Sequence, residues 1–486
     1  MNKKIIVLFR NDLRLDDHPA LWHAANTGAI LPLYIQNDQL IAQDSAQNYW
    51  TYYSLQNLQI IFSNYDMQLI LRKGDVISQV LQLALDTQAD AVYFNERFSQ
   101  TERSEDERLA HILRANDIEV KAFYGDTLFD VTSIRNQQNK PYAIFTSFYK
   151  RCLQELARKP LGRPANMQAF PMNVSSLALE QLQLLNGNWY NKFHNYWRPG
   201  MDGALDQWEL FIEGNLFDYK DKRDYLTKET ISKMSPFIAA GNISIRFLWT
   251  TCQELIEVED NAAFGQQVES FLRQLIWREF SIYQLLSYPS FSSLSLRSNF
   301  QHFEWEPNSL HLDAWKKGQT GYPLVDAGMR ELWETGYMHN RVRMVVASFL
   351  VKHLLQPWQE GYSWFEHTLL DFNAANNAMG WQWVSGTGID SAPYFRIFNP
   401  SLQGEKFDID GTYIKKWVPE LAHLPSKYIH APHTAPAAIL EQASITLGDT
   451  YPLPIVDHKT ARARALERYN AIKKAAGTQD NKKVLD

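Results

Sequence analysis

The sequence predicts two structural parts: an α/β amino-terminal domain built on a doubly wound parallel sheet, and a large all-α carboxy-terminal domain. Up to about residue 128, short apolar runs alternate with segments of helical length, which is typical of a parallel sheet covered by helices on both faces. Beyond residue 200, apolar residues recur instead at helical spacing. The length of 486 residues leaves room for two or three domains.

The predicted strands are five apolar runs, at 4–10, 29–36, 67–73, 89–96 and 118–125. Residues 75–87 and 101–115 are predicted as helices between the strands. This part of the chain contains neither a GxGxxG motif nor a P-loop, so we expect no ordinary dinucleotide or nucleoside triphosphate site there.

The predicted domain organisation has three segments: an α/β domain at 1–128, a connection at 129–200 and a helical domain at 201–486. The connection shows weak periodicity and contains NQQNKPY and RKPLGRPANM. Such polar, proline-containing stretches indicate a chain that wraps around other elements and does not fold alone.

Composition limits the classes of protein that remain. The net charge of −6 predicts that any nucleic-acid surface is local. Cys152 and Cys252 are the only cysteines, too few for a four-cysteine metal or iron–sulfur site, and we expect no metal centre. The N-terminus shows no apolar segment long enough for a signal peptide or membrane span, so we expect a soluble, cytoplasmic protein.

A helix predicted at 268–283 has an apolar stripe on one side and a face with polar and aromatic residues on the other. That face contains Gln274, Trp277, Arg278 and Ser281, at positions i, i+3, i+4 and i+7. An aromatic ring beside hydrogen-bonding groups suits the wall of a ligand site. A solvated face with a half-buried tryptophan is the alternative.

A second helix, predicted at 336–358, is apolar nearly all round after Met344, so we expect it to be buried and to end at Pro357. Arg341 and Arg343 lie near its start, where the helix dipole favours anions. Buried cations need negative partners, and we expect Asp371 for one arginine and a phosphate for the other. A structural ion pair near the surface is the alternative.

The stretch DFNAANNAMGWQW at 371–383 combines polar and aromatic side chains that a solvated loop or an apolar core would not need together. They are Asp371, Asn373, Asn376, Asn377, Trp381 and Trp383. The following residues, 384–408, contain glycines and prolines that predict turns. We expect loops there to offer Arg396, Gln403 and Lys406 to an anion, with scattered surface charges as the alternative.

Motifs along nearly the whole chain resemble one family in that family's order. They are FRNDLRLDDHPAL, KRDY, QLIWREF, TGYPLVDAGMR, YMHNRVRM, ANNAMGWQW and PYFRIFNPSLQGEKFD. The chain is identified by this resemblance as a member of the photolyase/cryptochrome family, most similar to bacterial cyclobutane pyrimidine dimer (CPD) photolyases. The resemblance implies a lyase that repairs dimers in DNA by electron transfer from light-excited reduced FAD.

The resemblance also implies which residues bind FAD. They are Tyr219, Ser232, Lys233, Met234, Ser235, Phe271, Gln274, Arg278, Asn340, Arg343, Asp371, Asn373 and Asn377. Asp371 is expected to pair with Arg343 beside the isoalloxazine, and Asn377 to lie against flavin N5. An amide at N5 cannot donate a proton as a carboxylic acid does, so Asn377 suits an enzyme that keeps FAD fully reduced.

Electron transfer and DNA binding are assigned by the same resemblance. Trp381, Trp358 and Trp305 match a chain of tryptophans that leads from flavin to surface. The expected DNA-binding residues are Arg223, Gln274, Trp277, Arg278, Asn340, Arg341, Met344, Trp383, Arg396 and Gln403, with Lys406 as an addition. Trp277 and Trp383 match the pair that packs against the flipped-out dimer, and Met344 the methionine below it.

Several positions depart from the family pattern. The usual Thr and Arg are Ile231 and Lys233, Asn373 replaces an aspartate, and Phe271 and Tyr337 stand where Trp is common. The largest departure is Gln274, where CPD enzymes have a glutamate that stabilises the dimer radical anion. Glutamine can donate and accept hydrogen bonds but cannot lend a proton, so we expect slower or altered repair.

Two other functions remain as alternatives. The (6-4) photolyases have Gln at the position of Gln274, but they need histidines where this chain has Asn340 and Met344. Cryptochrome photoreceptors commonly have long carboxy-terminal tails and a different residue opposite N5, whereas this chain ends soon after ERYNAIKKA and has Asn377. Both features favour the enzyme.

A second, light-harvesting chromophore is the least defined expectation. Glu102 matches a glutamate that binds methenyltetrahydrofolate in related enzymes, although one glutamate in a charged helix is usually solvated. A deazaflavin, a second flavin or no antenna are the alternatives. We expect a monomer, the simplest state for a DNA-binding groove.

Overall fold

The computed structural model describes residues 3–37, 44–227, 230–259 and 261–483, and its contacts divide the chain into two compact units. Unit 1 comprises Met1–Lys220, Thr230–Pro289 and Leu370–Ala375. Unit 2 comprises Asp221–Glu229, Ser290–Leu369 and Asn376–Asp486. This division does not follow the predicted boundaries at 128 and 200, because the helices between 201 and 289 group with the α/β part.

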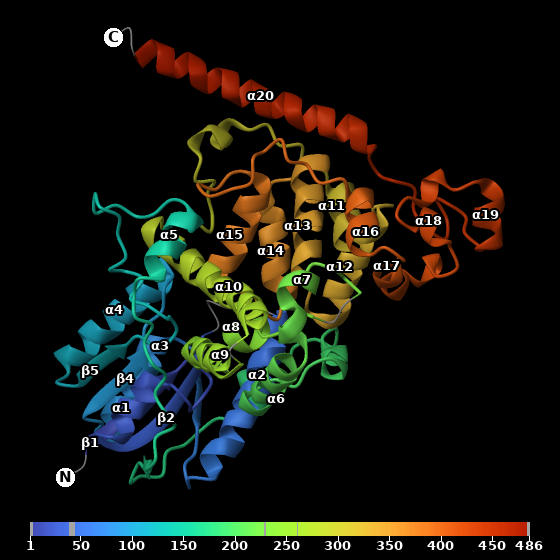
Figure 1. Cartoon of the computed structure of the whole chain (residues 1–486). Helices are drawn as coiled ribbons and strands as arrows, with labels where there is room; N and C mark the ends of the chain where they lie inside the picture. Colours follow the sequence, from blue (N-terminus) through green and yellow to red (C-terminus); the bar gives the residue numbers. More distant parts are fainter. Residues whose placement is uncertain (1–2, 38–43, 228–229, 260, 484–486) are drawn as a thin grey trace. The chain divides into compact units, whose positions relative to one another are not determined.

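Unit 1 contains a parallel sheet with strand order β3-β2-β1-β4-β5 (Figure 1). Its strands are β1 Lys3–Phe9, β2 Gly28–Gln36, β3 Ile70–Lys73, β4 Ala91–Asn95 and β5 Glu119–Phe123, with a short β6 Gln168–Ala169 that also pairs with β2. The five predicted strands are therefore confirmed. The sequence did not predict β6, because a two-residue strand has no period to detect.

Helices cover both faces of the sheet, as predicted for a doubly wound fold. Side chains alternate along β1, so that Ile5, Val7 and Phe9 enter one apolar core while Ile6 and Leu8 enter another. The first core is completed by α1 Pro19–Ala25 and α2 Ala46–Ser63, and the second by α3 Val76–Thr87 and α4 Gln100–Ala115. Every residue of β2 is buried, which explains its nearly continuous apolar sequence.

The remaining helices of unit 1 include the first of the predicted functional segments. They are α5 Phe145–Cys152, α6 Met201–Glu213, α8 Ser235–Ala239, α9 Ile245–Glu259 and α10 Ala262–Ser287. Asn261 caps α10, because its side chain accepts hydrogen bonds from the N–H groups of Ala263 and Phe264. The predicted apolar stripe of α10 is buried, including Phe271 and Leu275.

The segment 129–200 is fastened to α10. The Tyr283 hydroxyl donates to the Ile134 carbonyl (3.1 Å) and accepts from the Tyr142 N–H (2.7 Å). Gln284 Nε2 donates to the Tyr142 carbonyl (2.9 Å). The predicted connection therefore contains an ordered helix, α5, that packs against α10 in the same unit.

Unit 2 is helical, which confirms the predicted all-α part. Its helices are α11 Ser309–Lys316, α12 Pro323–Thr335, α13 Asn340–Ser348, α14 Trp358–Thr368, α16 Pro400–Phe407, α17 Thr412–Trp417, α18 Ser426–Ile429, α19 Ala437–Gln442 and α20 His458–Lys483. Helix α15 Ala374–Ser385 begins in unit 1 and continues into unit 2, and α7 Tyr219–Lys222 likewise spans the division. None of the helices described is both long and apolar enough to cross a membrane.

Two details of the helical prediction are wrong. The helix predicted at 336–358 is α13 followed by a π-helical turn, Phe349–His353, and it ends before Pro357 because Leu355 takes the left-handed conformation (φ 51°). The loop predicted to contain Gln403 and Lys406 is helix α16. Its start is fixed by Pro400 in the first turn and by the Asn399 side chain, which accepts from the N–H groups of Ser401 and Leu402.

Candidate functional site

The polar face of α10 in unit 1 is only partly open. Gln274 and Trp277 are half-buried, whereas Arg278 and Ser281 are buried. Gln274 Nε2 donates to the Ser270 carbonyl one turn earlier (3.0 Å), an anchor that leaves the amide oxygen for a ligand. The Trp277 ring stacks on Phe145 from α5. The ligand wall stays a prediction, with Gln274 and Trp277 as the residues of this face that a ligand could reach.

Arg278 has internal partners. Its guanidinium donates to the Asp126 carbonyl (2.8 Å), forms an ion pair with the Asp126 carboxylate and lies 3.7 Å from Glu279. Glu279 is fully buried and accepts a hydrogen bond from the Leu128 N–H (3.0 Å). Burial raises the pKa of Glu279 to about 8, against the opposing effect of Arg278. Contact between Arg278 and FAD or DNA stays a prediction, and would have to compete with Asp126.

The turn from Ser232 to Ser235 has the geometry of an anion site. Lys233 is left-handed (φ 54°) and Met234 right-handed (φ −79°, ψ −16°), a pairing that can turn successive backbone N–H groups to one side. The Met234 N–H donates to the Ser232 hydroxyl (3.4 Å), so an anion would have to share or replace that contact. Lys233 adds a cation. The Ser235 hydroxyl donates to Asp371 Oδ2 (2.6 Å). The cation and the hydroxyl groups suit the phosphates of FAD, and their binding of those phosphates stays a prediction.

Further predicted FAD-binding residues lie elsewhere in unit 1. Tyr219 and Phe271 are buried and meet edge to face, with ring centroids 5.7 Å apart. The segment of Asp371 and Asn373 is fastened by Gln47, which donates to the Phe372 carbonyl (2.6 Å). Asp371 and the Ser232–Ser235 turn are thus brought together, although they are distant in sequence.

Arg341 in unit 2 has a partner that differs from the two expected. It forms an ion pair with Asp224 and lies 4.5 Å from the centroid of the Phe407 ring. Met344 Sδ is 4.0 Å from Arg341 Nη1. Asp371 and a phosphate were the predicted partners of the two arginines, so for Arg341 the structure adds an acidic partner that the sequence did not indicate.

The start of α13 is fixed by His339, whose Nδ1 accepts from the Arg341 N–H (3.1 Å) and whose pKa is lowered to about 4 by burial. Asn340, the first residue of α13, is exposed. Arg343 Nε donates to the Met338 carbonyl (2.7 Å), and its guanidinium lies 5.2 Å from the Tyr337 ring centroid. The pairing of Arg343 with Asp371 stays a prediction.

Asn377 lies half-buried on α15. Its Nδ2 donates to the Tyr362 carbonyl (3.1 Å). The hydrogen bond fixes the orientation of the side chain and leaves the amide oxygen free to accept. This geometry is compatible with the predicted contact to flavin N5.

The three predicted electron-transfer tryptophans lie in unit 2 and differ in exposure. Trp358 and Trp381 are buried, whereas Trp305 is half-buried. Trp381 packs directly on α14, because a Cβ added to Gly361 would lie 2.0 Å from its ring, and Trp358 is the first residue of that helix. A backbone hydrogen bond from Glu306 to Leu355 (2.9 Å) brings the segment of Trp305 to the residues before Trp358.

The other predicted DNA-binding residues are distributed over unit 2. Arg223 precedes Asp224, Trp383 is half-buried on α15, Gln403 lies on α16, and Arg396 is exposed. The Arg396 carbonyl accepts a hydrogen bond from Lys352 Nζ (2.9 Å). Lys352 is buried, and burial lowers its pKa to about 7. Lys406 is exposed beside the ring of Phe407.

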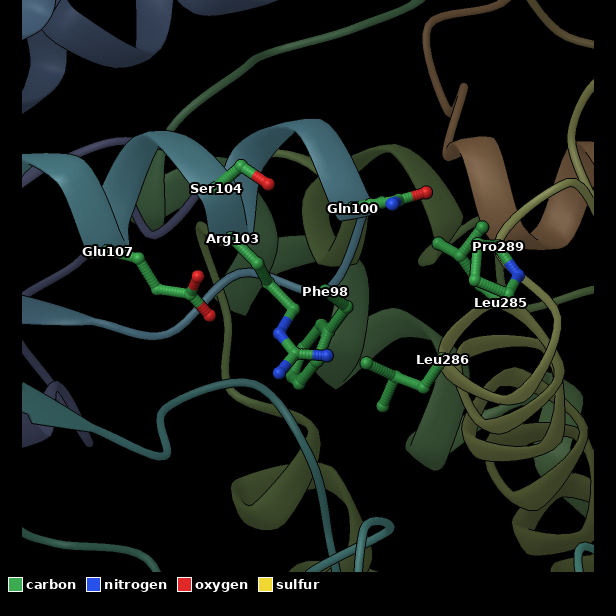
Figure 2. A pocket seen from close by; sticks show the side chains of 8 residues that line it. All are labelled: Phe98, Gln100, Arg103, Ser104, Glu107, Leu285, Leu286 and Pro289. Atoms are coloured by element: carbon green, nitrogen blue, oxygen red, sulfur yellow. The ribbon is translucent and has the colours of Figure 1, made fainter.

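A cavity of about 260 Å³ lies beside α4 in unit 1 (Figure 2). Its lining comprises Phe98, Gln100, Arg103, Ser104, Glu107, Leu285, Leu286 and Pro289. Glu102, the predicted antenna residue, is not among them, because its carboxylate accepts hydrogen bonds from the Ser99 hydroxyl (2.6 Å) and N–H (3.2 Å) in a capping box. Its antenna role stays a prediction.

Three residues that were not predicted each contact a predicted site residue: Asp224, Asp126 and Phe145. Asp224 directly follows Arg223 in KRDY, and an acidic residue inside a predicted phosphate-binding motif was the available indication. Phe145 and Phe148 recur at helical spacing in FTSFYKRC, which indicates an amphipathic helix. Nothing in the local sequence indicates that Asp126 pairs with Arg278.

Comparison with known proteins defines the class of this protein. Residues 271–471 match the model of the FAD binding domain of DNA photolyase, and residues 5–168 match the DNA photolyase model. The chain thus has the two parts of a flavin-dependent, light-using protein.

Similar proteins establish the family. The chain is 40% identical to the deoxyribodipyrimidine photo-lyase of Agrobacterium fabrum, over 97% of this chain and 98% of that protein. It is 35% identical to Arabidopsis thaliana cryptochrome-2, over 100% of this chain and 82% of that protein. The crystal structure of a class III photolyase from Agrobacterium tumefaciens matches with a TM-score of 0.93 at 40% identity, over 98% of both chains. The chain belongs to the photolyase/cryptochrome family.

Proposed function

We propose that this protein is a deoxyribodipyrimidine photo-lyase that uses light to split cyclobutane pyrimidine dimers in DNA. The supporting observation is its near-complete match, in sequence and fold, to proteins of that name. The half-buried Gln274 and Trp277 on one face of α10 support a site for an extruded base, because enzymes hold such bases by stacking and by hydrogen bonds to their polar edges.

FAD is the cofactor, because residues 271–471 match the FAD binding domain of DNA photolyase; the contacts of individual residues with it are proposals. When bound, reduced and excited by light, it supplies the electron that opens the cyclobutane ring. In unit 1 we assign its phosphates to the Ser232–Ser235 turn and further contacts to Tyr219. In unit 2 we assign contacts to Arg343 and to the oxygen of Asn377. Trp381, Trp358 and Trp305 are proposed to pass electrons inward when FAD must be reduced.

DNA is proposed to bind through a small set of cations. Arg223, Arg341 and Arg396 are assigned to phosphates, and Gln274 and Trp277 to the dimer. Few phosphate contacts predict a modest dependence of affinity on salt. A local set also explains how a chain with a net charge of −6 binds a polyanion.

The test is light-dependent repair. Purified protein, photoreduced in the presence of a thiol, is mixed with an oligothymidylate that contains CPDs, and the recovery of thymine absorbance is followed with and without blue light. We expect recovery only in the light. No recovery, with FAD shown spectroscopically to be reduced, would refute the proposal.

A blue-light photoreceptor of the cryptochrome type is the second candidate. The likeness to a plant cryptochrome over the whole chain and the presence of Gln274 favour it. Gln274→Glu separates the two functions. If the protein is a repair enzyme, the rate of CPD repair should change in this variant. A photoreceptor without repair activity will stay inactive on CPDs.

For an antenna chromophore we propose the cavity beside α4. It joins polar groups, including Arg103 and Gln100, to an apolar wall from the end of α10, a combination typical of small-molecule sites. The chromophores released on denaturation would be identified by mass spectrometry in wild type and in Arg103→Ala. Loss of a second chromophore with FAD retained is expected. Equal occupancy in the variant would exclude this cavity.

A further inference from the structure

We propose that Phe145 is a positioning residue that supports Trp277 from one side and thereby fixes the indole for stacking on a base of the damaged DNA. The inference rests on the proposed repair function. Phe145 lies in the segment before α6, which the sequence predicts only as a connection.

The geometry of the ring pair is specific. The centroids of Phe145 and Trp277 are 3.5 Å apart and their planes differ by 6°. At that separation the two rings are in direct contact over their faces. Phe145 is 2% exposed, whereas Trp277 is half-buried. One face of the indole is therefore covered by phenylalanine, and a base can stack only on the other face.

Phe145 is itself held firmly by its neighbours. It is the first residue of α5, and Phe148 one turn later packs against Phe280 (5.1 Å between centroids) and Tyr283 (4.7 Å) of α10. The residues before Phe145 are fastened to α10 through Tyr142. The supporting ring thus lies at the start of a helix that packs on α10 in the same unit.

The electrostatics explain why the pair is stable. Aromatic rings prefer offset or edge-to-face contacts, because two negative faces repel when stacked directly. The Arg273 guanidinium lies 5.1 Å from the Phe145 centroid and 4.8 Å from that of Tyr149. A cation over a ring is attracted to its negative face, so Arg273 offsets the repulsion that the close stack would otherwise cause.

The consequence is preorganisation of the base-binding surface. Without Phe145 the indole of Trp277 could rotate about its two side-chain torsions into the vacated space. Binding a flipped base would then cost the free energy of ordering the indole again. Undamaged DNA, which we expect not to extrude a base, does not use this surface. The contribution of Phe145 therefore appears in the preference for damaged over undamaged DNA.

The experiment compares the full-length, FAD-loaded wild type with three variants. Phe145→Leu removes the flat ring, Phe145→Tyr keeps it, and Phe62→Leu makes the same change at a buried position of α2, away from α10. Dissociation constants are measured in the dark for a CPD-containing oligothymidylate and for its undamaged counterpart. The rate of light-driven repair is measured at saturating substrate.

We expect Phe145→Leu to weaken binding of the damaged strand by about two- to tenfold, the range for loss of an aromatic pair. Binding of undamaged DNA and repair at saturation should not change. Phe145→Tyr and Phe62→Leu should keep the wild-type preference. An unchanged preference in Phe145→Leu, or an equal loss in Phe62→Leu, would overturn the proposal. Failure of the repair function itself would differ, because the wild type would then show neither preference nor repair.

Discussion

The ion pair between Arg341 and Asp224 makes a quantitative prediction about DNA binding. A phosphate that approaches Arg341 meets a guanidinium already paired with a carboxylate. The two side chains are 20% and 43% exposed, so the carboxylate is open to solvent whereas the guanidinium is mostly covered. Because one partner is solvated, we use the range for solvent-exposed pairs, about 0.2–1 kcal/mol, as the free energy a phosphate must replace when it takes over the arginine.

Asp224→Asn should therefore raise the affinity for DNA by up to about fivefold. The gain should be similar for damaged and undamaged strands, since a phosphate contact is independent of the lesion. Fluorescence anisotropy of labelled oligonucleotides in the dark, at several salt concentrations, measures it. Asp449→Asn is the matched control, because it makes the same change in net charge at an exposed position.

A double-mutant cycle separates this explanation from general electrostatics. In an Arg341→Ala background, Asp224 has no arginine to occupy, so Asp224→Asn should bring little further gain. Arg341→Ala alone should reduce the slope of log affinity against log salt by about 0.9. A gain that persists without Arg341, or an equal gain in Asp449→Asn, would show that Asp224 does not act by occupying Arg341.

Three further predictions concern single side chains. Gln274→Glu should speed the recovery of thymine absorbance, because a carboxylic acid can lend a proton to the dimer radical anion; an unchanged rate would contradict that role. Trp381→Phe should abolish photoreduction of FAD, followed by absorbance, while chemically reduced enzyme still repairs; Trp315→Phe, equally buried and 6.3 Å from Trp381, is the control and should photoreduce normally. For Glu279, burial raises the pKa from 4.5 to about 8. The carboxyl group therefore keeps its proton to higher pH in the folded state than in the unfolded chain. The free energy of unfolding should then fall as pH rises between these values, by about 1.4 kcal/mol per unit. Denaturant titrations between about pH 5 and pH 8 should show a flatter profile for Glu279→Gln than for wild type, and parallel profiles would contradict the assignment.

The sheet was predictable because its determinants are local. The residues of β1 are apolar on both faces, and β2 is buried throughout, so continuous apolar runs marked the strands. The helices α3 and α4 begin at Asp75 and Ser99, both ordinary capping residues. The apolar stripe of α10 followed from helical periodicity alone.

The two wrong predictions arose where one local sequence pattern is compatible with two backbone conformations. Glycine and proline near residue 400 suggested turns, but Pro400 lies in the first turn of α16, where the missing N–H costs nothing. The π-helical turn after Ser348 has no periodicity that distinguishes it from an α-helix. In both places the packing of the folded chain selected the conformation.

The partners of the charged site residues were the least predictable feature. Arg278 pairs with Asp126, 152 residues away, and Arg341 with Asp224, 117 residues away. The two residues of each pair are too far apart in the sequence for a local pattern to relate them. A sequence thus indicates that a cation requires compensation, while the identity of the compensating group is decided by tertiary contacts.

Two amides illustrate how backbone contacts set the chemistry of a side chain. Gln274 donates to the Ser270 carbonyl (3.0 Å), and Asn377 donates to the Tyr362 carbonyl (3.1 Å). In each case the fixed N–H leaves the amide oxygen as the acceptor for a ligand. A carboxylate at either position could not donate to that carbonyl and would be repelled by it. Glutamate at 274 would therefore gain a proton to lend and lose its anchor, so the benefit of Gln274→Glu depends on the carboxyl group being protonated when it faces the dimer.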